Sequence, residues 1–212
     1  MSRNSDGGAL MNFKRSLAIA VLFLTTLSAH AATSLDQIMR STAGQQAEFI
    51  HRFTPKGFKK AQTESGRVAF GTAPQMRWTY TTPESKVFVF DGRTSWMYAA
   101  AERQVTVTRL DEAQRKMIPL AFLWDPAAKK SYSTSERKTS SGTQITLAPT
   151  APDALLRQIR VDLGRDGRIR LVDYVDRQGN RTQFELSRYT PLPAGQAVFT
   201  FTPPAGVQVI EH

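Results

Sequence analysis

The sequence predicts an α+β domain in which one large, curved antiparallel sheet carries helices on one side. Most of the chain after residue 32 alternates apolar and polar side chains with a period of two, as β-strands do. Turn sequences separate these runs, and the pair Asp91-Gly92 is typical of a tight hairpin because both residues tolerate positive φ angles. Only two segments show helical spacing. About a dozen strands and two helical pieces imply a single sheet with the helices on one side.

The first residues have the features of a secretory signal peptide. A basic pair precedes an apolar run, Leu17–Leu27, and the small residues Ala29 and Ala31 follow it. This run of about eleven residues is well short of the roughly twenty that span a bilayer. We therefore expect residues 1–31 to be a signal peptide cleaved after Ala31, with Met11 as an alternative start of translation.

The remainder, residues 32–212, has a length that suits one domain. No cysteine occurs anywhere in the chain, which excludes both a disulfide scaffold and an anchor on a lipid-modified cysteine. No other apolar stretch approaches spanning length. We therefore expect a soluble protein in the periplasm, the space between the two membranes of its producer.

The exported part is basic. Without residues 1–31, which hold three basic residues and one acidic residue, 25 Lys and Arg stand against 17 Asp and Glu, a net charge of +8. Such a balance favours anionic partners. Export argues against nucleic acid. The densest patches, Phe58–Lys60 and Arg165–Arg170, are either solvated faces or contacts with anionic lipid head groups or an acidic protein.

The exported part is expected to begin with a short amphipathic helix, because Leu35, Ile38 and Met39 are one turn apart after two candidate capping residues. From Gln46 the period changes to two. The expected strands lie at about Gln46–Phe53, Gln62–Phe70, Gln75–Thr81, Lys86–Phe90, Thr94–Ala99, Gln104–Arg109, Tyr132–Glu136, Thr143–Ala148, Gln158–Leu163, Arg168–Val175, Arg181–Tyr189 and Ala197–Thr202. Asp111–Trp124 interrupts them with helical spacing around a proline.

Six aromatic side chains fall on three neighbouring strands. Trp78 and Tyr80 share one face of their strand, and Trp96 and Tyr98 share one face of theirs. The strand Lys86–Phe90 between them is apolar on both faces and must be covered on both. A helix on the concave side of a curved sheet would provide cover, and any gap beneath it would be an apolar pocket. An ordinary core rich in aromatic residues is the alternative interpretation.

Several runs of the chain match a known signature. They are RWTYTTPESKVFVFDGRTSWMY (77–98), ERQVTVTRL (102–110), LGRDGRI (163–169), DRQGNRTQFEL (176–186) and FTFTPPAGVQVI (199–210). Through them the chain resembles the LolA family, the periplasmic carriers of outer-membrane lipoproteins, over nearly all of residues 32–212. The closing Phe-x-Phe-x-Pro-Pro-x-Gly-Val pattern is specific in combination with the hairpin around Asp91-Gly92.

The resemblance implies an unclosed, half-open β-barrel whose helices form a lid over a hydrophobic cavity. It implies a carrier that binds the acyl chains of lipoproteins in that cavity. Such a carrier takes its cargo from an inner-membrane ATP-driven release complex and passes it to an outer-membrane lipoprotein receptor. We expect a monomer that needs no cofactor.

Alternation and the resemblance together give the candidate site residues. The expected cavity lining is Met76, Trp78, Tyr80, Phe88, Phe90, Trp96 and Tyr98. The expected lid residues are Met117, Ile118, Leu120, Phe122 and Leu123. Soft methionine side chains suit acyl chains of variable shape. Because alternation alone does not say which face of a strand lines the cavity, the opposite face stays an alternative.

One position departs from the family pattern. Members carry an Arg-Pro pair shortly before the strand Trp, and that arginine holds the lid shut, whereas Thr72 and Ala73 stand here. Arg67 and Arg77 are the candidates to replace it. A divergent member with a different lid or a different lipid cargo is the alternative.

The chain offers little for catalysis or metal binding. After residue 31 it has His51 and His212 and no cysteine, too few for a catalytic triad or a zinc site. The aspartates between residues 162 and 176 lie in ordinary turn sequences without the spacing of a calcium loop. We therefore expect a binding protein with no metal, not an enzyme.

Two other functions fit the same residues. The first is an accessory envelope protein with a filled core that binds an anionic membrane surface or a protein partner. The second is a carrier whose cargo is a glycolipid. Salt separates the first from a lipoprotein carrier, because surface binding through basic residues weakens with ionic strength and burial of acyl chains does not.

Overall fold

The computed structural model describes residues 34–72, 74–111, 114–115, 130–151, 154, 156–193 and 198–212. The chain divides into two compact units, Met1–Ala31 and Ala32–His212, and all described residues belong to the second. The predicted signal peptide and most of the predicted helical segment after Asp111 lie outside the described residues.

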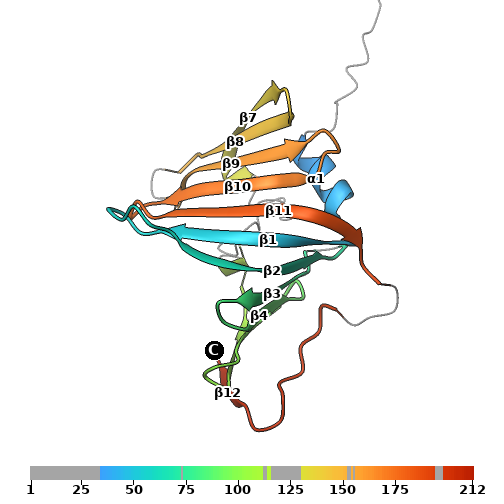
Figure 1. The fold of residues 1–212 in the computed structure, drawn as a ribbon, viewed down its shortest axis with the longest axis vertical. Coiled ribbons are helices and arrows are strands. Elements are labelled where there is room, and N and C mark those ends of the chain that lie inside the picture. Colours follow the sequence, from blue (N-terminus) through green and yellow to red (C-terminus); the bar gives the residue numbers. More distant parts are fainter. Residues whose placement is uncertain are drawn as a thin grey trace, which may run out of the picture. The chain divides into compact units, whose positions relative to one another are not determined.

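The described elements are one helix with defined bounds and twelve strands (Figure 1). They are α1 (Ser34–Thr42), β1 (Gln45–Thr54), β2 (Gln62–Phe70), β3 (Met76–Thr82), β4 (Lys86–Phe90), β5 (Thr94–Ala99), β6 (Gln104–Arg109), β7 (Tyr132–Thr139), β8 (Gly142–Pro149), β9 (Leu156–Gly164), β10 (Ile169–Asp176), β11 (Arg181–Pro191) and β12 (Gln208–Glu211).

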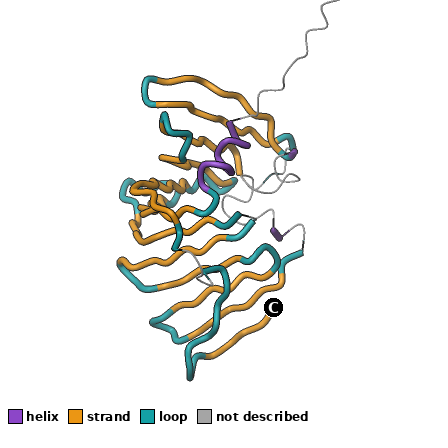
Figure 2. Tube along the Cα trace, turned by 90° about the vertical axis from the view of Figure 1, so that its right-hand side faces the viewer, coloured by secondary structure: helices purple, strands orange, loops and turns teal. Residues whose placement is uncertain are grey.

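All twelve strands belong to one sheet, in the order β12-β6-β5-β4-β3-β2-β1-β11-β10-β9-β8-β7. Figure 2 shows them following one another as a single continuous layer. Every pairing is antiparallel except that of β12 with β6, which is parallel. The two end strands do not pair with each other, so the sheet is unclosed. The predicted large antiparallel sheet is confirmed.

The C-terminal strand differs from the prediction. Within the predicted strand Ala197–Thr202, residues 198–202 are turn and irregular structure, and the last strand is β12 at Gln208–Glu211. The apolar alternation of Phe199 and Phe201 is typical of a strand. Phe201 instead packs its ring on Tyr98 of another strand, and no strand pairing forms at this residue.

Helix α1 ends where its sequence favours a stop. The hydroxyl of Thr42 donates to the carbonyl of Ile38 (2.7 Å), and Gly44 follows with φ 70°, the left-handed conformation common after a helix. The amide of Gly44 donates to the carbonyl of Phe70 (2.9 Å), which ties the helix end to β2. Ile38 is fully buried and Met39 packs beside it, so the predicted apolar stripe is confirmed at both residues.

The predicted hairpin at Asp91-Gly92 joins β4 and β5. One carboxylate oxygen of Asp91 accepts from the backbone amides of Arg93 and Thr94, both at 2.8 Å. Gly92 has φ 105°, which a residue with a side chain rarely adopts. The loop is Asp91–Arg93, one residue longer than the tightest hairpins.

Strand register separates the sheet into two faces, because residues directly opposite each other in an antiparallel pair lie on the same face. One face, here called the core face, carries the main hydrophobic cluster and packs against α1 through Ile38. The cluster comprises Ile38, Ala47, Phe49, Val68, Phe70, Met76, Trp78, Phe90, Ile145, Leu147, Ile159, Val161, Leu163, Ile169, Val172, Phe184 and Leu186. The other face is here called the outer face.

The outer face is apolar where the C-terminal segment crosses it. Val87 and Val89 of β4 point outward and are 9% and 0% exposed. Phe201 packs on Tyr98 of β5 with ring centroids 5.9 Å apart. The expectation that Lys86–Phe90 is covered on both faces is therefore confirmed for these two valines.

Gly66 in β2 gives a test of this packing. A Cβ atom at this position would lie 1.9 Å from the carbonyl oxygen of Thr79 on the adjacent strand. We expect Gly66→Ala to lower the free energy of unfolding by about 1–3 kcal/mol, because a backbone clash forces β2 and β3 apart. Urea denaturation of residues 32–212 measures it. Ser65→Ala on the same strand is the control and should change stability by less than about 0.5 kcal/mol; an unchanged Gly66→Ala protein would contradict the packing.

Candidate functional site: the aromatic core face and the outer groove

The centre of the core face is a group of aromatic rings from three strands. Phe49 of β1 meets Trp78 and Tyr80 of β3 edge to face, with centroids 4.9 and 4.8 Å apart. Phe184 of β11 lies 5.0 Å from Trp78. Such edge-to-face contacts add to the stabilisation from burial. The aromatic group thus joins the middle strand of the sheet to strands on both sides.

Five of the predicted lining residues belong to this face. Met76, Trp78 and Phe90 are at most 4% exposed and form part of the packed core. The indole nitrogen of Trp78 donates to the sulfur of Met76 (3.2 Å). Tyr80 and Phe88 are half-buried and pack at the edge of the cluster. These two therefore present more aromatic surface to a ligand than the three buried residues.

The prediction for Trp96 and Tyr98 needs correction, because they do not share a face with the other five predicted lining residues. Trp96 pairs with Val89 and Tyr98 with Val87. Both valines lie on the face of β4 that is opposite to the face of Phe88. These two aromatic side chains are thus on the outer face, where Phe201 covers Tyr98. Alternation correctly places both on one face of their strand. It cannot say which of the two faces of one strand continues a given face of its neighbour.

The predicted latch residues are also on the outer face. Arg67 pairs with Thr79, and Arg77 pairs with Val89, so both arginines point away from the core cluster and from α1. Arg77 instead donates to the carbonyls of Val198 (3.4 Å) and Thr200 (3.5 Å), which holds the C-terminal segment against β3.

The other predicted residues lie outside the described part of the chain. These are the lid residues Met117, Ile118, Leu120, Phe122 and Leu123, together with Ala73. Thr72, at the position of the family arginine, is exposed.

Sequence reasoning missed two central residues of the aromatic group, Phe49 and Phe184. Both lie in strands that the sequence predicts, and the alternation of Ala47, Phe49 and His51 is visible in it. What could not be read is that β1 pairs with β11, so that His51 stands opposite Phe184. The two residues can be identified once it is known that they share a face of the sheet, and this requires knowing that β1 pairs with β11.

A polar cluster borders the aromatic group. Nδ1 of His51 lies 3.0 Å from one carboxylate oxygen of Glu64, and Lys86 donates to the other oxygen at 2.5 Å. The His51 ring stacks on Phe184 (centroids 4.4 Å apart, planes at 8°), and Lys86 lies over the Tyr80 ring at 4.4 Å. The cluster therefore places one carboxylate and two nitrogen groups at the edge of an apolar surface.

Burial and hydrogen bonds together set the protonation of this cluster. Burial lowers the pKa of His51, although Glu64 opposes the shift. Burial alone would raise the pKa of Glu64, but hydrogen bonds from Lys86 and His51 outweigh it and lower the pKa. At neutral pH His51 is therefore uncharged with its proton on Nδ1, because a carboxylate can only accept. Burial also raises the pKa of Tyr80, which stays a neutral phenol.

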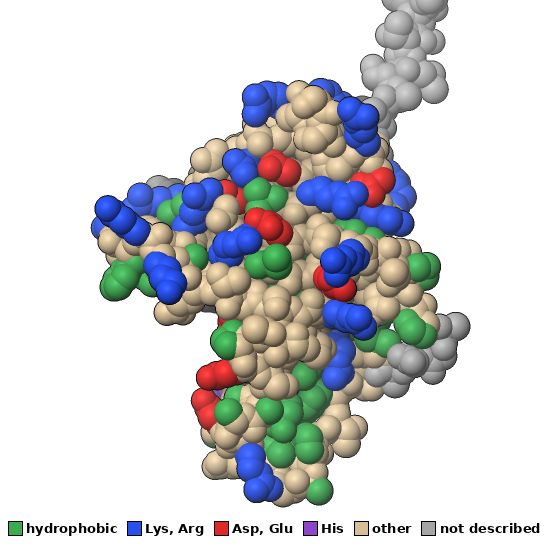
Figure 3. All heavy atoms as spheres, viewed as in Figure 1, with side chains coloured by type: hydrophobic (Ala, Val, Ile, Leu, Met, Phe, Trp, Pro, Cys, Tyr) green, Lys and Arg blue, Asp and Glu red, His purple; other side chains and the backbone are tan. Residues whose placement is uncertain are grey.

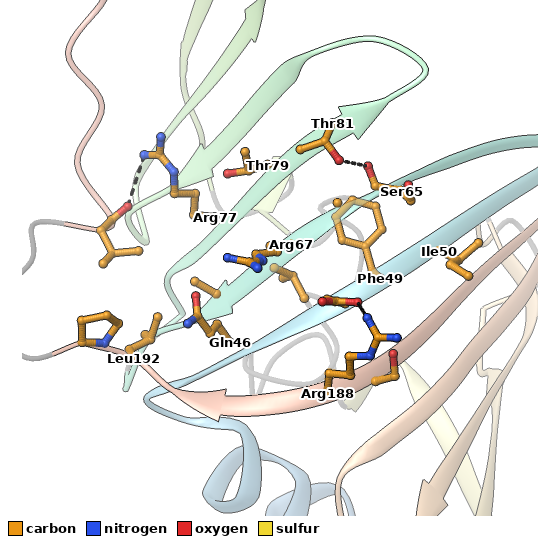
Figure 4. A pocket seen from close by; sticks show the side chains of 17 residues that line it. Gln46, Phe49, Ile50, Ser65, Arg67, Arg77, Thr79, Thr81, Arg188 and Leu192 are labelled. Atoms are coloured by element: carbon orange, nitrogen blue, oxygen red, sulfur yellow. Dashed lines mark hydrogen bonds and ion pairs between the residues drawn. The ribbon is translucent and has the colours of Figure 1, made fainter.

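The outer face carries a groove of about 850 Å³ between β11, β1, β2, β3 and the C-terminal segment (Figure 4). Polar and charged side chains line much of it: Gln46, Glu48, Ser65, Arg67, Arg77, Thr79, Thr81, Ser187 and Arg188. Apolar contributions include Ile50, Leu192 and Val198. Unlike the core face, the groove is suited to a partly polar ligand.

The charge of the groove is positive. Arg188 pairs with Glu48 at 2.7 Å, and Figure 4 shows Arg77 on the side of the groove opposite Arg188, with Arg67 between them. Burial lowers the pKa of Arg77, although the group stays protonated at any physiological pH. Among the described lining residues, three guanidinium groups stand against one carboxylate, which favours an anionic ligand.

Among the described residues, no group of three or more His, Asp or Glu side chains is placed to hold a metal ion. In the same part of the chain, no helix is long and apolar enough to cross a membrane. The core face presents apolar rings with one small polar cluster at their edge.

By its fold and by this face, the chain belongs to the class of proteins built as one open antiparallel sheet with one apolar aromatic face. Residues 40–202 match the family model described as "Outer membrane lipoprotein carrier protein LolA". The chain belongs to this family.

Curated relatives agree with this assignment. The "Outer-membrane lipoprotein carrier protein" of Xanthomonas axonopodis pv. citri (strain 306) is 35% identical over 89% of this chain and 92% of the relative. The protein of the same name from Dechloromonas aromatica (strain RCB) is 27% identical over 94% of this chain and 98% of its own. A crystal structure of an uncharacterised conserved protein from Thermus thermophilus has the same fold, with TM-score 0.53, 15% identity, and coverage of 84% of this chain and 97% of that one.

His51 makes stability depend on pH. Its folded pKa lies below the unfolded value of about 6.5, so the unfolded chain takes up the proton first and stability falls as pH drops below that value. Each unit by which folding lowers the pKa of His51 removes up to about 1.4 kcal/mol from the free energy of unfolding at acidic pH. We expect the free energy of unfolding to fall as the pH drops below about 6.5, and His51→Gln to remove this part of the dependence. Glu64 acts in a lower window, because its stability contribution is lost only below its unfolded pKa of 4.5.

Denaturation curves of both proteins across this pH range measure the effect. Parallel curves for the two proteins would show that His51 titrates as it does in the unfolded chain.

Arg77 gives a second test, on the C-terminal segment. We expect Arg77→Ala to speed hydrogen exchange at the amides of β12, because the segment that leads to β12 loses its bonds to β3. The contacts are long and half-exposed, so an effect of about 1 kcal/mol is expected. Arg67→Ala is the matched control in the same groove. Equal exchange in both variants would mean that the segment is held without Arg77.

Proposed function

We propose that this protein is a periplasmic carrier that binds the acyl chains of lipoproteins against the core face and moves them from the inner to the outer membrane. Family membership carries the proposal, since relatives that match over most of their length are named outer-membrane lipoprotein carrier proteins. The half-buried rings of Tyr80 and Phe88 support it, because they leave aromatic surface at the edge of a buried core.

The physical requirement for such a carrier is large. Each exposed methylene group costs about 0.8 kcal/mol in water, so a diacyl or triacyl anchor costs on the order of tens of kcal/mol if left bare. An apolar protein surface that replaces the bilayer removes most of this cost. No covalent step is needed, and we propose neither an enzymatic activity nor a cofactor or metal.

The cover of the acyl chains is proposed to be the segment around residues 117–123. Its residues Met117, Ile118, Leu120, Phe122 and Leu123 are apolar and would close over the core face as a lid. In this arrangement the chains lie between sheet and lid. The polar cluster of His51, Glu64 and Lys86 would then face the polar end of the cargo.

The route of the cargo is proposed from the family. A monomer released into the periplasm by cleavage after Ala31 would accept lipoproteins from an inner-membrane ATP-driven complex and deliver them to an outer-membrane receptor. The positive outer groove favours an anionic surface on one of these partners. Nucleic acid is not among the proposed ligands.

The outer groove also favours a second candidate function, that of an accessory envelope protein. In this case the core face is filled by its own lid, and an acidic partner binds Arg67, Arg77 and Arg188. Binding through these arginines weakens steeply with added salt, whereas burial of acyl chains changes little. Affinity for a synthetic triacylated peptide at low and high salt therefore separates the two functions.

Phe88 tests where the acyl chains bind. We expect Phe88→Ala to weaken binding of a triacylated peptide by about tenfold or more, since a phenyl ring in contact with the ligand contributes about 1.5–3 kcal/mol. Tyr98→Ala is the matched control, an aromatic residue of the adjacent strand on the opposite face. Fluorescence titration measures affinity, and melting curves show that both variants are folded. Equal losses, or a loss only in the Tyr98 variant, would contradict binding on the core face.

The cargo itself is identified by native mass spectrometry of the protein isolated from its own envelope, followed by lipid analysis of the released material. A co-purified acylated protein is the expected result. A free glycolipid would keep the binding surface and change the cargo. Empty protein that also fails to bind the triacylated peptide would favour the accessory function.

A further inference from the structure

The loop between β1 and β2 combines an exposed aromatic ring with positive charge. Residues Lys56–Lys60, here called the tip, are all exposed, and the Phe58 side chain is 69% exposed, more than any other large hydrophobic residue described. Lys56, Lys59 and Lys60 flank it. A phenylalanine held in water between lysines gains little within the fold, because most of its surface stays in water.

The tip has a fixed shape. The amide of Phe58 donates to the carbonyl of Pro55 (3.0 Å), and the amide of Lys56 donates to the side-chain oxygen of Asn180 (3.0 Å). Asn180 belongs to the loop between β10 and β11, so the two hairpin ends lie side by side (Figure 1). Hydrogen bonds thus hold Phe58 outward, where most of its ring stays uncovered.

The charge of the tip is not neutralised by the fold. Elsewhere on the sheet, cations pair with carboxylates, as Arg188 does with Glu48 and Arg181 with Asp173. Lys56, Lys59 and Lys60 make no ion pair among the described residues. The neighbouring hairpin adds one basic residue, Arg177, and one acidic residue, Asp176 at the end of β10, whose two oxygens accept from Asn180 at 2.8 Å each, so it leaves the positive balance of the tip unchanged.

Figure 3 shows the same region as a projection. Basic side chains and an apolar surface extend together at the left, where Figure 1 places the ends of the β1–β2 and β10–β11 hairpins. A projecting hairpin meets a flat surface before the rest of the sheet does. An apolar ring between cations suits the boundary of a lipid layer, where the ring enters the acyl region and the cations remain at the phosphates.

We propose that the tip, Lys56–Lys60, docks this protein reversibly on membranes that contain anionic phospholipids. Phe58 enters the interfacial layer, and the three lysines bind lipid phosphate groups. One ring and three lysines give a weak contact that allows release, as a protein that moves between two membranes requires. The inference goes beyond the proposed carrier function, because it adds a direct contact with lipid to any contact with partner proteins.

The place of the tip on the sheet supports this orientation. Phe49, His51 and Phe53 share the core face of β1 and follow one another toward the tip. Docking through Phe58 would therefore bring the end of the core face that holds His51 and Glu64 nearest to the lipid surface.

The test is flotation of the exported chain with vesicles of phosphatidylethanolamine and phosphatidylglycerol, with phosphatidylcholine vesicles for comparison. We expect binding to the anionic vesicles, and about tenfold or greater weakening by Phe58→Ser and by Lys59→Glu with Lys60→Glu. The matched control is Arg93→Glu with Arg109→Glu, two exposed arginines at the β4–β5 turn and on β6 that change the net charge equally. This control should keep most of the binding.

Three results would overturn the proposal. They are no binding of the wild-type chain to anionic vesicles, equal binding by wild-type and tip variants, or an equal loss in the control. An equal loss would mean that net charge, not the tip, attracts the vesicles. Titration of each variant with the triacylated peptide keeps the two functions apart, because the tip variants should bind the peptide with unchanged affinity even if vesicle binding is lost.

Discussion

The pairing of β1 with β11 is the constraint on which the rest of the structure depends. These strands are far apart in the sequence, yet they join β2–β6 and β12 on one side to β7–β10 on the other. Without this ladder the sheet would be two separate pieces. Its register sets Phe49 opposite Leu186 and His51 opposite Phe184, and so brings Trp78 and Phe184 into contact from opposite sides of β1.

The same ladder fixes which face is apolar. Because side chains alternate along a strand, a shift of one residue between β1 and β11 would turn Phe49 and His51 to the outer face. The register is protected by what such a shift would expose, since Phe49 and Phe184 are only 2% and 4% exposed. Pairings over so long a sequence separation slow folding, because a long loop must close before they form. The aromatic group is therefore completed only when both halves of the sheet have met.

Much of the fold and part of the site could be predicted because their signals are local. The strands Lys86–Phe90 and Thr94–Ala99 have the predicted bounds, and the hairpin register of β3 and β4 turns Trp78 inward as expected. Tyr98 was assigned to the wrong face because alternation shows that Trp96 and Tyr98 share a face but not that this face continues the one of Val87 and Val89 on β4. Phe201 alternates like a strand residue, but its apolar ring serves contact with Tyr98 on the outer face.

The two faces of the sheet thus keep an apolar surface separate from a charged one, as a carrier requires. The core face holds apolar rings that must be hidden from water, and the outer face holds a groove lined by three arginines. Apolar and polar side chains come together at the β1–β2 end of the sheet. There His51, Glu64 and Lys86 border the aromatic group, and the tip projects beyond them. Cargo that enters from a membrane must pass from a polar to an apolar surface. At this end of the sheet, the described residues offer a polar and an apolar surface within one strand.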